Sequence, residues 1–216
     1  MLLFGGANDP IFMVGVFISV LVGMTVHEFA HNYVAYLMGD PTPKEQGRLT
    51  LDPMVHIYWP GFIMFVLIGF GILGAAPINS RRMRNPRWGY LAAVSAGPFS
   101  NLLIAIVAGV IYQLLSPAYG GILYWLLLTM VMFNVLLFLF NLLPLFPLDG
   151  WHMVYSLLPV DLAYKWRDMR QNLQFVFMAI ILLSFVPIQG FNPLGLLIGE
   201  PLRAITELLM GRNIWL

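Results

Sequence analysis

The sequence lacks cysteine and has few charged residues. None of the 216 residues is cysteine. That absence excludes disulfide bonds and thiolate metal ligands, so a zinc ion bound by this chain must take histidine and carboxylate donors. Charged residues make up only 10% of the chain, and the formal net charge is +1. A net charge so close to zero argues against a nucleic-acid partner.

Apolar residues, in contrast, are abundant. They make up 60% of the chain, more than a soluble domain of this size can bury, so the composition predicts an integral membrane protein of the helical type. The length suits a single domain over residues 1–216. Met1 to Pro10 has no basic residue, so we do not expect a cleaved signal peptide.

The apolar runs predict an all-α polytopic bundle of about four to six transmembrane segments. Residues 11–38, 88–115 and 122–143 are each long enough to span a bilayer, and residues 173–187 form a shorter last crossing. Residues 194–210 read as an amphipathic helix with Glu200, Arg203 and Glu207 on one face. We expect a catalytic core over residues 11–155, then a C-terminal crossing and an interfacial helix within residues 171–210.

The first apolar run contains a His-Glu-Phe-Ala-His sequence. His27 and His31 are four residues apart, so on a helix both imidazoles lie on one side and can bind one Zn²⁺ ion. Glu28 lies beside them, placed to take a proton from a water that the metal activates. Ionisable groups in lipid are costly and rarely kept without a use, which favours this interpretation over two histidines that merely pack between helices.

An irregular stretch that ends in a carboxylate follows the run at residues 122–143. Two prolines, Pro144 and Pro147, interrupt the helix before Asp149. Irregular backbone at membrane depth is tolerated where it lines a protein cavity, so Asp149 is the expected third zinc ligand. His152 is the alternative, because it lies three residues further on and would share a face with Asp149 if that segment is helical.

The positions of these ligands constrain the topology. One metal can contact the histidines and Asp149 only if the apolar runs at residues 11–38 and 122–143 point the same way through the membrane. That requires the shorter apolar run at residues 61–76 to re-enter rather than cross. The positive-inside rule agrees, because nine of the eleven basic residues then lie on the cytoplasmic side. These are Lys44, Arg48, Arg81, Arg82, Arg84, Arg87, Lys165, Arg167 and Arg170.

Residues 48–52 alternate apolar and polar side chains. The alternation predicts a short membrane-associated β-strand that ends before Pro53. A transmembrane substrate must unwind before hydrolysis, and an exposed strand edge around Arg48 and Thr50 could hold it by strand addition. A plain connecting loop is the alternative. We expect His56, which follows, to be a loop histidine rather than a ligand.

Three motifs together resemble the site-2 proteases, which are intramembrane zinc metalloproteases. These are His27 to His31 in an apolar helix, Ser95 to Pro98 with Asn101, and Asn141 to Gly150, which ends in Leu-Asp-Gly. The resemblance covers most of residues 11–155. Its form here is minimal, because the turn at residues 116–121 is too short for an inserted PDZ domain and nothing indicates a CBS domain.

The resemblance implies one zinc ion per chain, held by His27, His31 and Asp149, with Glu28 as the catalytic base. It implies cleavage of peptide bonds within or near transmembrane segments, either in regulated intramembrane proteolysis or in signal-peptide clearance. We expect Asn101 and Asn141 either to join helices or to bind substrate or oxyanion.

The expected partners are membrane proteins or peptides as substrates, and membrane lipid. The expected location is a prokaryotic plasma membrane, with the site near the cytoplasmic side. A non-catalytic membrane zinc protein or a transporter is the alternative, but it would need further ionisable residues along a path.

Overall fold

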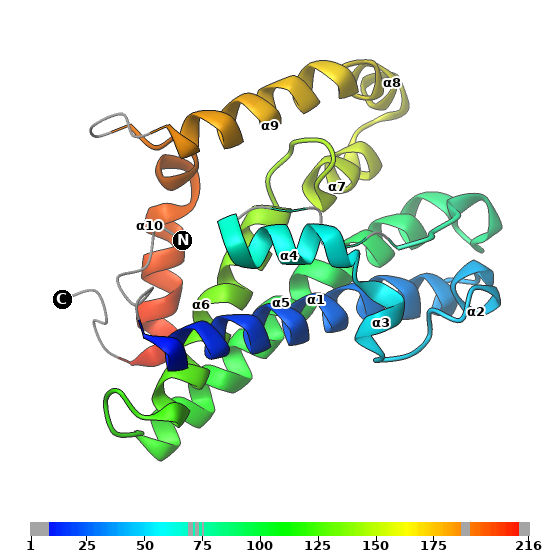
Figure 1. Cartoon of the computed structure of the whole chain (residues 1–216). Coiled ribbons are helices and arrows are strands. Elements are labelled where there is room, and N and C mark those ends of the chain that lie inside the picture. Colours follow the sequence, from blue (N-terminus) through cyan, green and yellow to red (C-terminus); the bar gives the residue numbers. More distant parts are fainter. Residues whose placement is uncertain (1–8, 69–70, 72–73, 75, 187–190, 212–216) are drawn as a thin grey trace.

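Three long helices form the centre of the molecule (Figure 1). The computed structural model describes residues 9–68, 71, 74, 76–186 and 191–211, and over these residues the regular structure is entirely helical. The long helices are α1 (Pro10–Leu37), α5 (Pro86–Leu115) and α6 (Ile122–Asn141). Each is long and apolar enough to cross a membrane. The prediction of a helical membrane bundle is confirmed at this level.

The sequence marks where these helices begin and end. Asp9 caps α1 by accepting a hydrogen bond from the Ile11 amide at 2.8 Å, and Pro10 occupies the first turn, where its missing amide hydrogen costs nothing. The helix ends before Gly39, whose φ of +104° favours glycine. Pro98 lies inside α5, which continues through it as one helix of 30 residues.

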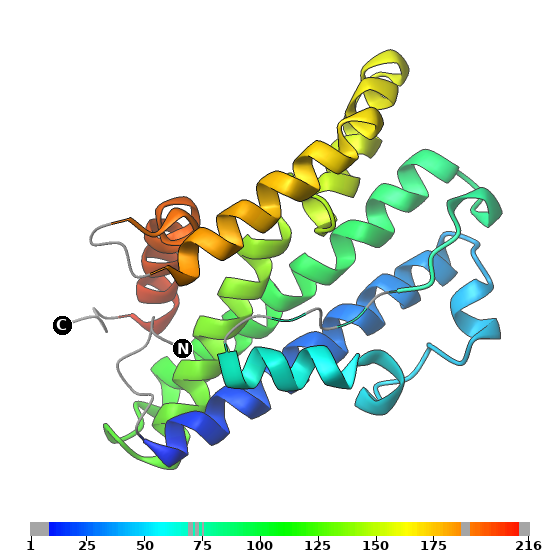
Figure 2. The same cartoon turned by 45° about the horizontal axis from the view of Figure 1, so that its top comes forward.

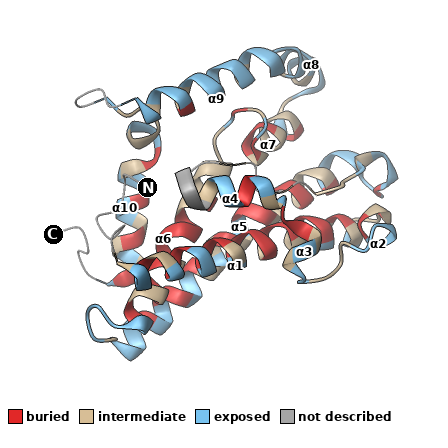
Figure 3. Ribbon diagram, viewed as in Figure 1, coloured by how far each residue is buried: buried red, intermediate tan, exposed pale blue. Residues whose placement is uncertain are grey.

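Small residues let the three helices approach closely. A Cβ atom at Gly15 of α1 would lie 2.8 Å from the Thr129 hydroxyl of α6, and one at Gly23 would lie 2.7 Å from Asn134 Oδ1. Ser19 donates a hydrogen bond to Thr129 at 3.0 Å in the same contact. Such contacts are typical of helix association in lipid, where the hydrophobic effect does not drive helices together and close packing must do so instead. The facing sides of α1, α5 and α6 are buried accordingly (Figure 3).

Between α1 and α5 the chain forms short elements. They are α2 (Thr42–Glu45), α3 (Pro53–His56), α4 (Trp59–Ile68) and the 3₁₀ helix η1 (Ser80–Arg82). The 10 residues of α4 rise about 15 Å, roughly half the thickness of a hydrocarbon core. Ile57 before α4 pairs with Gly74 after it in an isolated antiparallel bridge. The chain therefore leaves along α4 and returns to the level at which it started.

The strand predicted over residues 48–52 is wrong. Those residues form bends and open loop, and the described part of the chain holds no strand beyond the Ile57–Gly74 bridge. Polar groups of the segment bond within their own loop instead. Thr50 accepts from the Asp52 amide at 3.1 Å, Asp52 caps α3 by accepting from Met54, and Arg48 donates to the Val55 carbonyl. A short alternating pattern could not distinguish these local contacts from a strand.

After α6 the chain turns through an irregular loop into four further helices. They are α7 (Asp149–Leu157), α8 (Val160–Asp168), α9 (Arg170–Phe185) and α10 (Pro193–Met210). α9 lies apart from α1 and α5 in both views (Figures 1 and 2) and buries only Phe177 and Ile181 among its described residues. At 16 residues it is shorter than the three candidate spans. The described chain thus has three long spans where about four to six were expected.

The amphipathic pattern expected for residues 194–210 is present in α10. Ile198, Leu202, Thr206 and Met210 are buried, whereas Arg203 lies on the exposed face and donates to Glu207 at 3.0 Å. The buried face packs on α6, and Gln113 of α5 donates to the Leu209 carbonyl at 2.8 Å. The position of this helix at a membrane surface stays a prediction.

Candidate metal centre

Two imidazoles and one carboxylate converge between α1, α5 and α7. Nε2 of His27 and Nε2 of His31 lie 3.0 Å apart, and each lies 3.2 Å from Oδ2 of Asp149. Both histidines are buried within α1, with relative exposures of 3% and 4%. Asp149 is the first residue of α7. These three residues form the one group of His, Asp or Glu side chains in the described structure whose donor atoms could hold a metal ion together.

The geometry of the three donor atoms fits a zinc ion. Ligands at the ordinary Zn–N and Zn–O distances, on the corners of a tetrahedron, are separated by about 3.3 Å, which is close to the separations observed. The Nδ1 atom of each histidine faces an acceptor oxygen, so Nδ1 carries the proton and Nε2 presents its lone pair. Two lone pairs and a carboxylate oxygen at such distances repel unless a cation lies among them.

Each imidazole is oriented by a hydrogen bond on its far side. Nδ1 of His27 donates to Oδ1 of Asn101 at 2.7 Å, and Nδ1 of His31 donates to the Ala93 carbonyl at 2.8 Å. The Asn101 amide group in turn donates to the Gly23 carbonyl and to Asn134 Oδ1, both at 3.0 Å. These contacts fix which amide atom faces His27. Partners of this kind fix the tautomer and ring orientation of a metal-binding histidine.

Two glycines make the convergence sterically possible. A Cβ atom at Gly97 of α5 would lie 2.3 Å from His31 Nε2 and 2.8 Å from His27 Cε1. One at Gly150 would lie 2.4 Å from the carbonyl oxygens of Leu142 and Leu143. Gly97 therefore lets α5 pass directly beside the imidazole pair, and Gly150 lets the irregular loop fold tightly against the start of α7, where Asp149 lies.

Glu28 is buried beside the imidazole pair. Its Oε2 atom has no hydrogen-bond partner among the described residues, and a Cβ atom at Gly74 would lie 2.7 Å from its Oε1 and 2.9 Å from the His56 carbonyl. The backbone that returns from α4 therefore passes directly over the carboxylate. Burying a carboxylate oxygen without a partner is costly, and such costs are typical of functional sites, so the position of Glu28 is consistent with the predicted general base.

His56 is the last residue of α3 rather than part of an open loop. Its side chain is 2% exposed, and its Nε2 lies 2.6 Å from the Thr50 carbonyl. It is not one of the three converging ligands in the described structure, and its apolar neighbours Val55 and Ile57 are the sequence signal of its burial.

His152 lies outside the group of three converging ligands. Its Nδ1 lies 2.8 Å from the hydroxyl oxygen of Tyr90 in α5. Burial lowers the pKa of His152, which favours the neutral ring. Asp149 is the residue that meets the two imidazoles, with Oδ2 3.2 Å from each.

The remaining candidates do not converge on the imidazole pair through any contact in the described structure. Asn141 donates to the Leu137 carbonyl of its own helix at 3.0 Å, and Arg48 and Thr50 bond within their loop. Asn134, by contrast, is fully buried and reaches the site through Asn101. Asn134 was not expected at the site, although an amide in the middle of an apolar run is itself a sign of a polar contact inside the bundle.

The fold and the site together define a membrane protein with a buried His-His-Asp metal group. Comparison with known sequences makes the class more specific. The chain is 37% identical over 181 residues to "Putative zinc metalloprotease YwhC" of Bacillus subtilis (strain 168), which covers 81% of each chain. It therefore belongs to the site-2 protease-like family of zinc metalloproteases, and the resemblance noted in the sequence is confirmed.

Other relatives match a smaller part. "Putative zinc metalloprotease Rip2" of Mycolicibacterium smegmatis is 32% identical over 105 residues, which is 44% of this chain and 40% of that protein. Rip2 of Mycobacterium tuberculosis (strain ATCC 25618 / H37Rv) is 35% identical over 82 residues, or 33% of this chain and 31% of that protein. No family model matches the chain. No solved structure matches it either.

Proposed function

We propose that the chain is an intramembrane zinc endopeptidase that cleaves peptide bonds within or near transmembrane segments of other proteins. The observation that supports this most directly is the place of the metal group. His27 and His31 lie inside a helix that is long and apolar enough to span a bilayer. A peptide bond that reaches them must therefore lie at membrane depth.

In this proposal His27, His31 and Asp149 hold one zinc ion. Three protein ligands leave one position open, where zinc would lower the pKa of a water to about 7 and polarise the substrate carbonyl. Asn101 and the Ala93 carbonyl keep the two imidazoles oriented.

Glu28 acts as the base. Its carboxylate takes the proton of the attacking water, and it later delivers that proton to the nitrogen of the departing amine. The burial of Glu28 and the lack of a partner for its Oε2 in the described structure leave that oxygen free for this task. Burial also excludes bulk water from the carboxylate, which strengthens its interaction with a proton donor.

The proposed topology places the site toward the cytoplasmic side of a prokaryotic plasma membrane. The bridge between Ile57 and Gly74 and the shortness of α4 support a re-entrant course for residues 61–76. With that course, the basic residues between α1 and α5 and those after α7 share one side, as the positive-inside rule requires.

A comparison of wild type with Glu28→Gln tests the function. Each is co-expressed with a panel of tagged single-span substrates and leftover signal peptides, and the products are followed by immunoblot. We expect cleavage by wild type and a loss of at least about 100-fold in the variant, the lower range for a general base. Zinc content should be unchanged, because Glu28 is not a proposed ligand. Equal cleavage by the two proteins would refute the proposal.

A further inference from the structure

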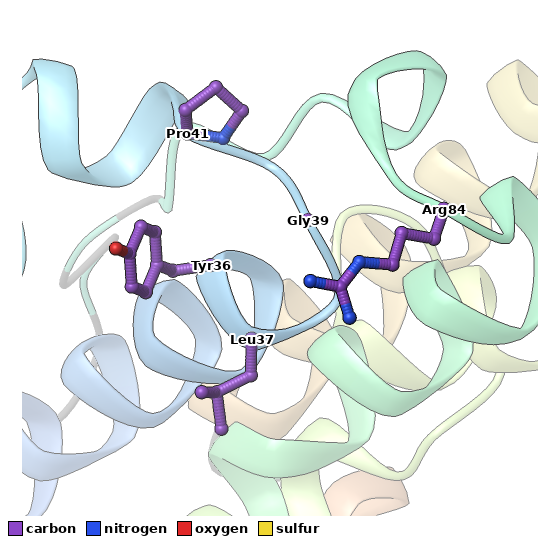
Figure 4. Close-up of a pocket in the computed structure, with 5 residues that line it drawn as sticks. All are labelled: Tyr36, Leu37, Gly39, Pro41 and Arg84. Atoms are coloured by element: carbon purple, nitrogen blue, oxygen red, sulfur yellow. The ribbon is translucent and has the colours of Figure 1, made fainter.

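A pocket of about 290 Å³ lies at the end of α1, on the loops that follow this helix and precede α5. Its lining residues are Tyr36, Leu37, Gly39, Pro41 and Arg84. Figure 4 shows the Arg84 side chain reaching toward the end of α1, with its guanidinium group near Gly39 and Leu37. None of these residues takes part in the metal centre.

Arg82 and Arg87 of the same loop have partners within the chain, whereas the side chains of Arg81 and Arg84 have none in the described structure, and of these two only Arg84 lines the pocket. Arg82 pairs with Glu45 through two hydrogen bonds of 2.6 and 2.7 Å, and this pairing lowers the pKa of Glu45. Arg87 donates to the Ser156, Leu157 and Leu158 carbonyls at the end of α7. The Arg84 guanidinium makes no hydrogen bond and no ion pair within the described part of the chain. Its charge is therefore available to a ligand.

The surroundings of the Arg84 group combine charge with apolar surface. Leu37 in the pocket is 47% exposed, and Tyr33, one turn earlier on α1, is 45% exposed. A second cation lies next to one of the lining residues, because Lys44 Nζ is 5.7 Å from the centre of the Tyr36 ring. A ligand that fits must carry negative charge next to a hydrocarbon part.

The position of the pocket at the ends of two candidate membrane spans indicates which ligand this is. α1 ends and α5 begins beside it, and both are candidate spans, so a bilayer crossed by these two helices would place the pocket where the hydrocarbon layer gives way to headgroups. Its volume is at the lower end of the range for small-molecule pockets, roughly 300–1,000 Å³. That suits one headgroup rather than a whole lipid. Basic pockets between helices on the cytoplasmic side are known to bind anionic headgroups.

We propose that this pocket binds the phosphate headgroup of an anionic phospholipid, with Arg84 as the principal contact and the acyl chains lying along Leu37 and Tyr33. The nearby Asp40 carboxylate does not compete for Arg84. It is fully buried and accepts hydrogen bonds from the Thr42 amide, the Thr42 hydroxyl and the Asn79 amide at 3.0, 2.6 and 2.6 Å. The proposal is independent of the proteolytic function.

The test compares Arg84→Gln with Arg81→Gln. Both substitutions remove one positive charge from the same loop, but Arg81 does not line the pocket. The purified full-length protein is placed in nanodiscs of phosphatidylcholine with a small fraction of phosphatidylglycerol, and bound lipid is counted by native mass spectrometry. We expect Arg84→Gln to bind phosphatidylglycerol about fivefold more weakly than wild type, the effect of one cation at an anionic surface. Arg81→Gln should bind like wild type.

A second variant keeps the test decisive if Arg84→Gln does not fold. Leu37→Glu leaves Arg84 in place and puts a carboxylate at an exposed position beside it, and it should also abolish selective retention of phosphatidylglycerol. Equal losses in Arg81→Gln and Arg84→Gln would overturn the proposal in favour of a diffuse charge effect. Displacement of the lipid by millimolar inorganic phosphate would overturn it in favour of a free phosphate site.

Discussion

Oδ1 of Asn101 lies 2.7 Å from Nδ1 of His27, although 74 residues separate the two in the chain. The contact joins α5 to the metal group of α1. Because Asn101 also bonds the Gly23 carbonyl and Asn134, its side chain cannot turn away from the histidine without breaking two further hydrogen bonds. Asn101 therefore joins the helices, which is one of the two roles considered for it from the sequence, and it also orients His27. Its binding of substrate or oxyanion stays a prediction.

Replacing Asn101 by alanine should weaken zinc binding. The His27 ring loses the acceptor that fixes its tautomer, and removal of such a partner lowers metal affinity by about 10- to 100-fold. The measurement is a competition titration of the purified protein against a zinc chelator. Asn141→Ala is the matched control, since Asn141 bonds only to the Leu137 carbonyl of its own helix in the described structure. Equal affinities of the two variants would contradict the assigned role.

A methyl group at position 97 should disrupt the metal site. A Cβ atom there would lie 2.3 Å from His31 Nε2, a distance that real Cβ atoms do not reach, so α5 must shift away from α1 in Gly97→Ala. We expect zinc content to fall well below one ion per chain when it is measured by elemental analysis. Gly199→Ala is the control, because a Cβ atom at that position on α10 meets no atom within 4 Å.

Gly199→Ala should fold at least as well as wild type. Alanine is favoured over glycine inside a helix by roughly 0.5–1 kcal/mol, so a loss of zinc in both glycine variants would point to a general sensitivity of the fold. A loss in Gly97→Ala alone would locate the effect at the metal group.

The choice between Asp149 and His152 as third ligand can be settled by removing each in turn. Asp149→Ala takes away the carboxylate that lies 3.2 Å from both imidazoles and should abolish stoichiometric zinc. His152→Ala should keep it, since that ring contacts the Tyr90 hydroxyl and lies outside the converging group. Elemental analysis of both purified variants gives the answer. Full retention of zinc by Asp149→Ala would favour His152 instead.

Much of this site could be anticipated because helix geometry is local. A spacing of four residues puts His27 and His31 on one side of any helix, and the two prolines before Asp149 predicted the irregular loop that leads to it. The partners of the histidines could not be anticipated. Whether Asn101 or Ala93 faces an imidazole depends on how α5 is rotated against α1, and that rotation depends on many packed side chains at once.

The prediction of a short strand was wrong for a related reason. Five alternating residues satisfy a strand pattern, but the side chains of Thr50 and Asp52 can each accept a hydrogen bond from the amide two residues further on, as they do here. The re-entrant course of residues 61–76 stays a prediction, and it rests on the whole chain rather than on a local pattern. Two helices that each carry a metal ligand near their C-terminal end must run in parallel to bring those ligands to one depth.

The side of the membrane at which each loop lies can be tested by cysteine labelling, and the absence of native cysteine makes the experiment clean. Single substitutions Lys44→Cys and Arg81→Cys place one thiol before and one after the proposed re-entrant segment. Both should react with an impermeant maleimide only after the cells are opened. The structure supports a shared side for the two thiols, because Asp40 accepts a hydrogen bond from the Asn79 amide at 2.6 Å and so joins the two loops directly. Labelling of one thiol from outside and of the other from inside would mean that residues 61–76 cross the membrane, and α1 and α6 could then no longer bring His27, His31 and Asp149 to one depth.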